Sequence, residues 1–226
     1  MAADYDRLSE NGERQARLLG EFWLKTGARF AQVHTGPAER QIRTAEIAGA
    51  VLRAAGEPWP EATVHQELDE FPAEAVLRRF TPPLAAAHPE IAEGVAALQA
   101  ATEFAGKQRA FDRLLREVSR RWLAGEVSAP DIPSWQDFCH RVEAAVRRIT
   151  DAAPKSSQVA VFTSGGPTAA TTRVALGLTY EATLDLTWSP RNASYSEFLF
   201  TPGRFSLSTF NLTPHLSGDP ALLTYR

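Results

Sequence analysis

Apolar residues that recur at helical spacing predict two long helices, one near the start of the chain and one past its middle. The segment SENGERQARLLGEFWLKTG opens with Ser9, a favourable helix N-cap, and closes with Gly27, which suits the position after a last helical turn. The segment WQDFCHRVEAAVRRITDAA begins at Trp135 and is helical in pattern throughout. Each is expected to bury one apolar stripe, made of Leu18, Leu19, Phe22 and Trp23 in the first and of Phe138, Val142, Ala145, Val146 and Ile149 in the second.

Two short apolar runs each lead directly into another helical pattern. ARFAQVH ends at His34 and runs into TGPAERQIRTAEIAGAVLRAAG, in which Pro37 suits a first helical turn. QVAVF ends at Phe162 and runs into TSGGPTAATTRVALG. Because strands that alternate with helices favour a parallel sheet, we expect an α/β fold, a three-layer sandwich with helices on both faces of a mostly parallel sheet.

The stretch from Pro58 to Pro133 departs from this alternation. PWPEATVHQELDEFP is irregular with one candidate strand, whereas EIAEGVAALQAATEF and KQRAFDRLLREVSRRWLAG are helical with polar faces. We therefore expect residues 58–133 to form a helical insertion, over the C-terminal edge of the sheet, within a single domain of residues 1–226. After the second strand and helix, LDLTW, YSEFLF and FSLSTF predict three short strands.

Composition and charge narrow the function classes. The 44% hydrophobic and 23% charged residues are ordinary for a globular domain, and the net charge of -3 lacks the excess of Lys and Arg that nucleic-acid binding needs. No apolar run approaches the about 18 residues of a membrane span, so neither nucleic acid nor membrane is an expected partner. The single cysteine, Cys139, and a start without a signal-peptide pattern predict a cytoplasmic protein. No pattern indicates the oligomeric state.

The two strand-to-helix corners are where chemistry is expected. Ligands of open α/β sheets bind at the carboxyl ends of the strands, so VHTGPAER and FTSGGPT should face one pocket. Backbone N–H groups at a helix start favour an anion, and Arg40 adds a guanidinium group suited to phosphate. For either corner alone an alternative stays open, in which Gly36, Gly165 and Gly166 only permit tight turns.

Other common sites do not fit these corners. The chain has neither a Walker-type ending nor G-x-G-x-x-G, which disfavours a nucleotide ligand. Ser164 is not the nucleophile of a G-x-S-x-G elbow, because Phe162 stands where the first glycine is required. No metal-ligand spacing occurs, so we expect no metal and no other cofactor.

Several segments carry a family resemblance. DYDRLSENGERQA is similar to the pattern D-x-x-L-[ST]-x-x-G-x-x-Q-A, with a shift at the first acid, and HTGPAERQIRTA resembles an element with an arginine followed by T-A. LDEF, FTSGG and FNLTPHL are similar to L-x-E, V-S-H-G-G and N-x-x-x-H-L. From Asp4 to His215, in the right order, the chain thus resembles the histidine phosphatase (phosphoglycerate mutase-like) superfamily.

The resemblance implies a mechanism without a metal. In that family a histidine of an N-terminal Arg-His-Gly motif attacks the phosphoryl group, arginines and a second histidine bind its oxygens, and a glutamate protonates the leaving alcohol. Carried over to this chain, the resemblance makes Glu70 the catalytic acid. The phosphate ligands are then expected to be Arg40, Ser164, Gly165 and Gly166.

The chain departs from the family pattern at both histidines. Ser164 stands in place of the second one, and the Arg-His-Gly motif would fall upstream of Met1. Loss of the strand that carries this motif would leave a gap in the middle of the sheet. A start codon assigned too late, or a truncated chain, is therefore the expected explanation. A neutral hydroxyl gives phosphate a hydrogen bond worth about 0.5–1.5 kcal/mol, against roughly 1.5–3 kcal/mol for a charged donor. Binding is therefore expected to survive better than turnover.

The leading hypothesis is a phosphomonoester hydrolase that takes a phosphorylated small molecule or phosphate, with the chain as printed inactive or nearly so. The alternatives are a non-catalytic phosphate-binding protein, a pseudophosphatase, and a phosphoglycerate mutase-type phosphotransferase. The substrate cannot be read from the insertion. Other chemically capable residues are expected to serve packing or solvation instead: His34, His65, His88, His140, His215, Arg43 and Cys139.

Overall fold

Three parallel strands form the central sheet of the computed structural model, which describes residues 6–225, apart from the side chain of Phe104. The strands are β1 (Phe30–Thr35), β2 (Ala62–Val64) and β3 (Gln158–Phe162), and β1 lies in the middle. The register pairs His34 with Thr63 on one side and with Val161 on the other. The predicted parallel α/β sheet is thus confirmed, whereas Asp4, where the family resemblance begins, lies outside the described residues.

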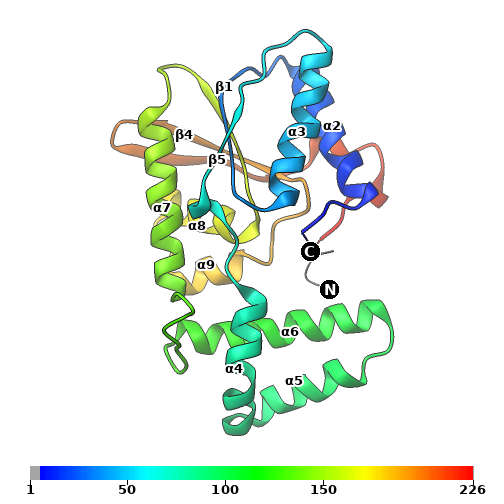
Figure 1. Ribbon diagram of the computed structural model, residues 1–226, viewed down its shortest axis with the longest axis vertical. Helices are drawn as coiled ribbons and strands as arrows, with labels where there is room; N and C mark the ends of the chain where they lie inside the picture. The colour runs from blue at the N-terminus through cyan, green and yellow to red at the C-terminus, as the bar shows by residue number, and fades with distance from the viewer. Residues whose placement is uncertain (1–5, 226) are drawn as a thin grey trace.

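Helices cover both faces of this sheet (Figure 1). One face packs against α2 (Glu10–Thr26) and α3 (Glu39–Ala54), with Leu19, Val33 and Ala48 buried between them. On the other face lies α7 (Trp135–Ala152), and α8 (Gly165–Leu176) packs against α7 below the ends of the strands. The Gln32 amide on that face donates to the Ala152 carbonyl at the end of α7.

The predicted helix signals at α2 and α7 act locally. Ser9 Oγ accepts the Gly12 N–H at 3.1 Å, and Gly27 ends α2 with φ 73°, a left-handed conformation that favours glycine. At α7, Ser134 and Asp137 form a reciprocal capping box, with each side chain accepting the other's backbone N–H. These ends explain why both helices begin and stop where the sequence predicts.

Three further helices, α4 (Ala73–Ala87), α5 (Pro89–Ala100) and α6 (Phe104–Leu123), lie together beyond the sheet at the lower end of Figure 1. The pattern of the sequence did not predict α4, because Pro82 and Pro83 lie inside it and proline removes a helical N–H donor. The helix forms nonetheless because its apolar stripe packs against α5 and α6. That stripe consists of Val76, Phe80 and Leu84.

The end of the chain corrects two predictions. LDLTW is not a strand, since most of it lies in α9 (Tyr180–Leu186), which Thr179 starts by accepting the Ala182 N–H at 3.2 Å. Pro37 precedes α3 rather than lying in its first turn, because Ala38 is the N-cap. The other two predicted strands form: β4 (Tyr195–Thr201) and β5 (Arg204–Leu212).

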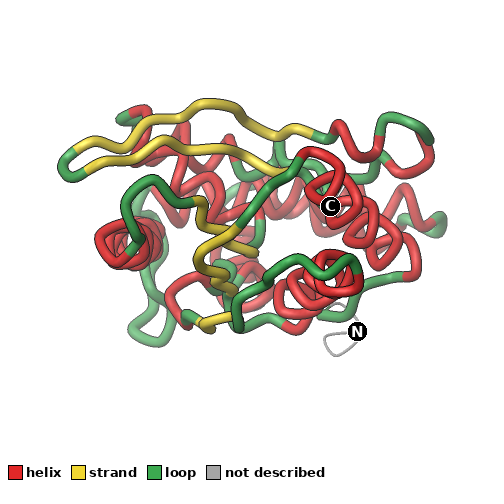
Figure 2. Tube along the Cα trace, turned by 90° about the horizontal axis from the view of Figure 1, so that it is seen from above, coloured by secondary structure: helices red, strands yellow, loops and turns green. Residues whose placement is uncertain are grey.

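The β4–β5 pair is an antiparallel hairpin that forms a sheet of its own (Figure 2). Within residues 6–225, β3 pairs with β1 alone. Short 3-10 turns complete the fold: η1 (Gln66–Leu68), η2 (Pro214–Leu216) and η3 (Pro220–Leu222). Among the described helices, none is long and apolar enough to span a bilayer.

Candidate functional site

The first corner, between β1 and α3, is tightly packed around Gly36. A Cβ atom at Gly36 would lie 2.1 Å from Gln41 Oε1 and 2.7 Å from the Leu68 carbonyl oxygen, so only glycine fits. The Gly36 N–H donates to the Phe162 carbonyl oxygen at 3.0 Å. Since Phe162 is the last residue of β3, this bond holds the first corner against the second one.

Gln41 links the two corners through its side-chain amide. Ala38, the N-cap of α3, has no side-chain acceptor, and Gln41 Oε1 accepts the Ala38 N–H at 3.2 Å. This bond orients the amide, so that its Nε2 group donates to Ser164 Oγ at 2.7 Å. Gln41 is only 3% exposed and is therefore a fixed part of the site.

Ser164 accepts hydrogen bonds from two side-chain nitrogen atoms that can only donate. Arg40 Nη2 lies 3.2 Å from its Oγ, and Gln41 Nε2 lies 2.7 Å away. The hydroxyl proton of Ser164 has no acceptor among the described residues. Ser164 is thus held as an acceptor on one side and keeps its O–H group for a further partner.

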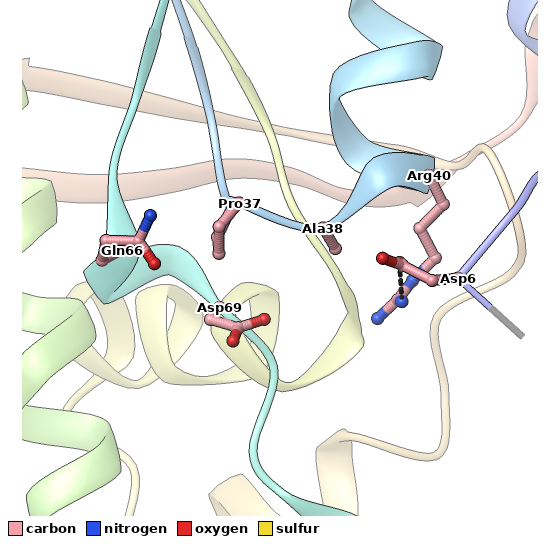
Figure 3. Close-up of a pocket in the computed structure, with 6 residues that line it drawn as sticks. All are labelled: Asp6, Pro37, Ala38, Arg40, Gln66 and Asp69. Atoms are coloured by element: carbon pink, nitrogen blue, oxygen red, sulfur yellow. Dashed lines mark hydrogen bonds and ion pairs between the residues drawn. The ribbon is translucent and has the colours of Figure 1, made fainter. Parts of the chain in front are cut away.

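Arg40 faces a carboxylate from the segment before α2. Its Nη1 lies 2.7 Å from Asp6 Oδ1 (Figure 3). Asp6 Oδ2 accepts the Glu39 N–H at 3.0 Å. The Arg40 side chain is 24% exposed and that of Asp6 41%. Asp6 therefore caps the start of α3 and neutralises its first-turn cation at the same time.

The second corner, between β3 and α8, also receives a carboxylate. Glu70 Oε2 accepts the Gly166 N–H at 3.1 Å, and its Oε1 accepts the Phe71 N–H at 2.9 Å. A Cβ atom on Gly166 would lie 2.0 Å from Glu70 Oε1, so glycine is needed for this approach. Thr163 Oγ1 donates to the Leu68 carbonyl at 2.8 Å and ties the corner to the segment that carries Glu70.

A hollow of about 270 Å³ opens at the first corner. Figure 3 shows Asp6 and Arg40 at one end and Gln66 and Asp69, from the η1 segment, at the other. Two carboxylates and one guanidinium group therefore line it. The full lining is Asp6, Pro37, Ala38, Arg40, Gln66 and Asp69.

The structure brings together the residues expected to hold a phosphate, and it adds two that the sequence did not indicate. Arg40, Ser164 and Gly166 lie around the junction of the two corners, with Glu70 bound to the last of them. Gln41 could have been found from its place three residues after the N-cap, where glutamine often returns a hydrogen bond. Asp6 gave no local signal, because its partner Arg40 is 34 residues away.

The histidines lie elsewhere, and none of the five in the sequence lines the hollow. His34 and His65 contact each other on the α7 side of the sheet, with 2.9 Å between Nδ1 of the first and Nε2 of the second. Burial lowers the pKa of both rings. His88 lies between α4 and α5, with ring nitrogens 3.8 Å from Glu90 Oε1 and 3.2 Å from Glu126 Oε2.

His215 and the Cys139-His140 pair do not line the hollow either. Burial lowers the pKa of His215 to about 4 and raises that of the Cys139 thiol to about 12. His140 is exposed and contacts the Tyr180 hydroxyl at 2.8 Å. The two neighbours thus point to core and surface, as their helical spacing predicts.

Arg43 does not add to the junction of the corners. Arg43 is half-exposed and pairs with Glu13 and Glu46 on the outside of α3. In the part of the chain that the structure describes, no three His, Cys, Asp or Glu side chains gather as a metal-ligand set.

Comparison with known proteins identifies the family of the chain. The model of the histidine phosphatase superfamily (branch 1) matches residues 3–93 and 99–213. No curated protein sequence matches the chain significantly.

Solved structures of the same fold cover most of the chain at low identity. A phosphoserine phosphatase mutant from Entamoeba histolytica, in complex with phosphoserine, is 17% identical with a TM-score of 0.60, covering 93% of this chain and 86% of that one. A phosphoglycerate mutase from Bacillus anthracis is 18% identical, with a TM-score of 0.57 and coverage of 93% and 84%. A mycobacterial glucosyl-3-phosphoglycerate phosphatase is 17% identical, with a TM-score of 0.58 and coverage of 92% and 88%.

Proposed function

The chain belongs to the histidine phosphatase superfamily, and we propose that the junction of its two corners binds the phosphoryl group of a phosphomonoester. The observation that carries this proposal is the Ser164 hydroxyl, which accepts from Arg40 and Gln41 and keeps its proton for an added acceptor. The start of α8 follows directly, so that backbone N–H groups lie beside that hydroxyl.

Three kinds of donor would then meet the phosphoryl oxygens. The Arg40 guanidinium supplies charge-assisted hydrogen bonds, and Ser164 Oγ–H donates one neutral bond. The N–H groups of Gly165 and Gly166 add the positive end of the α8 dipole. This ligand class agrees with solved structures of the same fold that are named for phosphoserine and glucosyl-3-phosphoglycerate.

Glu70 competes with the phosphoryl group for one of these donors. Its Oε2 occupies the Gly166 N–H, so a phosphoryl oxygen that takes this N–H displaces the carboxyl group. The displaced group remains beside the bound ester, where, once protonated, it can give its proton to the leaving alcohol. We therefore assign Glu70 the role of general acid in any hydrolysis at this site.

Turnover by the chain as printed is expected to be slow or absent. The family reaction needs a histidine nucleophile, and no histidine of residues 6–225 lines the hollow. Purified chain incubated with p-nitrophenyl phosphate should release p-nitrophenol far more slowly than an ordinary phosphatase. Rates comparable with such an enzyme would contradict this part of the proposal, and any turnover should persist in EDTA.

Binding of inorganic phosphate, measured by calorimetry, tests the site directly. Arg40→Gln should weaken binding by about 10-fold or more, because a charged hydrogen bond contributes roughly 1.5–3 kcal/mol. Arg43→Gln is the matched control, since Arg43 lies on the same helix but pairs with Glu13 and Glu46 outside the hollow. Equal phosphate affinity in the wild type and in Arg40→Gln would refute the proposed site.

A second candidate is a binding protein without catalysis. It is favoured by the neutral Ser164 in place of a second cationic ligand, an exchange that preserves recognition better than transition-state stabilisation. Saturable phosphate binding, lost in Arg40→Gln and accompanied by no turnover even after a strand with Arg-His-Gly is added before Met1 in Ser164→His, would support this candidate. Turnover gained in that extended variant would support the hydrolase instead.

A further inference from the structure

Asp6 lies where an anion bound by the start of α3 would lie. Its two carboxylate oxygens each accept one hydrogen bond, from Arg40 Nη1 at 2.7 Å and from the Glu39 N–H at 3.0 Å. The first of these donors is the guanidinium group expected to hold a phosphate. The second is a first-turn N–H group, which has no carbonyl partner within its own helix. Asp6 also lines the hollow itself.

The need for this carboxylate follows from the sequence of α3. Ala38 is the N-cap, and its methyl group cannot accept the N–H groups of the first turn. The side-chain oxygen of Gln41 accepts the Ala38 N–H but not the Glu39 N–H. A carboxylate from another segment therefore completes the start of α3.

Among the described residues that precede α2, few contacts hold the chain to α3. Beyond the bonds of Asp6 itself, Arg7 Nε lies 3.6 Å from Glu39 Oε1, and both of these side chains are more than half exposed. The next fixed point is Ser9, which caps α2. Release of Asp6 would therefore leave α2 and α3 in place, because exposed ion pairs such as this contribute at most about 1 kcal/mol each.

A phosphoryl group and the Asp6 carboxylate cannot both use this corner well. Of the two terminal nitrogens of Arg40, Nη1 donates to Asp6 and Nη2 to Ser164. A phosphoryl oxygen that takes the first nitrogen has to replace Asp6 Oδ1, and a dianion beside an undisplaced carboxylate meets like-charge repulsion.

We propose that Asp6 is an internal competitor that occupies the phosphate subsite of Arg40 and is displaced when phosphate binds. The inference rests on the proposed function and adds a residue that sets the affinity of the same pocket. Asp6 lowers phosphate affinity in the resting protein and at the same time keeps Arg40 oriented toward the corner.

Asp6→Asn separates competition from capping. Asparagine keeps an oxygen that can accept the Glu39 N–H, yet it removes the charge that pairs with Arg40. Calorimetric titration with inorganic phosphate at fixed pH and salt should show a dissociation constant roughly 3- to 10-fold lower than that of the wild type. Asp6→Glu, which keeps the charge, should bind phosphate within about two-fold of the wild type.

Two further variants control for charge alone. Asp69→Asn removes a carboxylate that lines the same hollow, and Asp219→Asn removes one that pairs with Arg14 elsewhere. If Asp6 competes by occupying the donors of Arg40 and Glu39, neither variant should raise phosphate affinity as much as Asp6→Asn does. A gain of equal size in Asp69→Asn would overturn the proposal in favour of a general field effect.

The outcomes separate this inference from the proposed function. If Arg40→Gln loses phosphate binding while Asp6→Asn binds no more tightly than the wild type, the competitor is refuted and the phosphate site stands. If Arg40→Gln binds phosphate as the wild type does, the site itself is refuted and the competitor with it. Thermal unfolding of each variant shows whether the fold is kept. Tighter phosphate binding by Asp6→Asn than by Asp6→Glu then supports the competitor, and equal binding refutes it.

Discussion

At the first corner β1 leads through Gly36 into α3, and at the second β3 leads through Ser164 into α8. Each helix start receives a carboxylate from a distant segment, Asp6 in one case and Glu70 in the other. Only the first corner has a cation, because Arg40 lies in the first turn of α3, whereas α8 begins with glycines. The same strand-turn-helix plan thus produces one corner that can bind by charge and one that offers neutral donors.

The two corners also differ in how closely they are packed. Gly36 lies against the Leu68 carbonyl and the Gln41 side chain, whereas a Cβ atom on Gly165 would meet only the Thr187 carbonyl oxygen, at 3.3 Å, and Pro190 at 3.9 Å. Neither glycine has φ in the left-handed region, so space alone decides what each position tolerates. The cationic corner is therefore expected to be the more rigid of the two.

Replacing each of these glycines by alanine tests the difference in packing, and Gly36→Ala is the substitution expected to have the largest effect. Gly36→Ala should lower the free energy of unfolding by about 1–3 kcal/mol, because the added methyl group meets backbone that cannot turn aside. Gly165→Ala should change it by less than about 1 kcal/mol, since alanine fits and favours the helix start. Urea unfolding of both variants measures the two values, and equal losses would remove the contrast in packing.

Ser164→Ala tests the neutral corner, with a smaller effect than the loss of Arg40. Phosphate affinity should fall about 2- to 10-fold, the size expected of one neutral hydrogen bond. Thr163→Val is the control, because the Thr163 hydroxyl bonds to the Leu68 carbonyl inside the fold. A loss of phosphate affinity as large as in Arg40→Gln would show that the two corners contribute equally to binding, and the proposed difference between them would be wrong.

Local signals explain which parts of the structure could be predicted. The caps of α2 and α7 lie within three residues of the groups they bind, so the sequence displays them directly. The same is true of the strand-to-helix corners, whose apolar runs end at glycines. The order of the strands in the sheet and the hydrogen bond between Gly36 and Phe162 are long-range and had no such signal.

The errors have physical causes as well. LDLTW has the alternation of a strand, but Thr179 caps a helix there, and burial of Leu184 decides the outcome. For α4, packing of Val76, Phe80 and Leu84 outweighs two prolines. In the candidate site, the family pattern indicated roles for Arg40, Ser164 and Glu70. Asp6 matched that pattern only as its first acid, and its contact with Arg40, 34 residues away, is encoded by no local rule.

The strands that lead to the corners differ in one more respect, since β1 carries a buried histidine where β3 has a valine. His34, paired in register with Val161, is 8% exposed and contacts His65. Burial lowers the pKa of His34 below its ordinary value of 6.5, and the charge of His65 lowers it further. Because the unfolded chain then takes up protons first, stability should fall as pH drops below about 6.5.

His34→Gln should reduce the loss of stability at acid pH, and this is the smallest of the expected effects. Glutamine can keep a hydrogen bond to His65 but cannot take up a proton, so the urea midpoint should fall less between pH 7.5 and pH 5 than in the wild type. His140→Gln is the matched control, because it replaces an exposed histidine on α7 instead of the buried one on β1. If His34→Gln keeps the full acid sensitivity, its cause lies outside β1, and His215, with its pKa lowered to about 4 by burial, is the next group to replace.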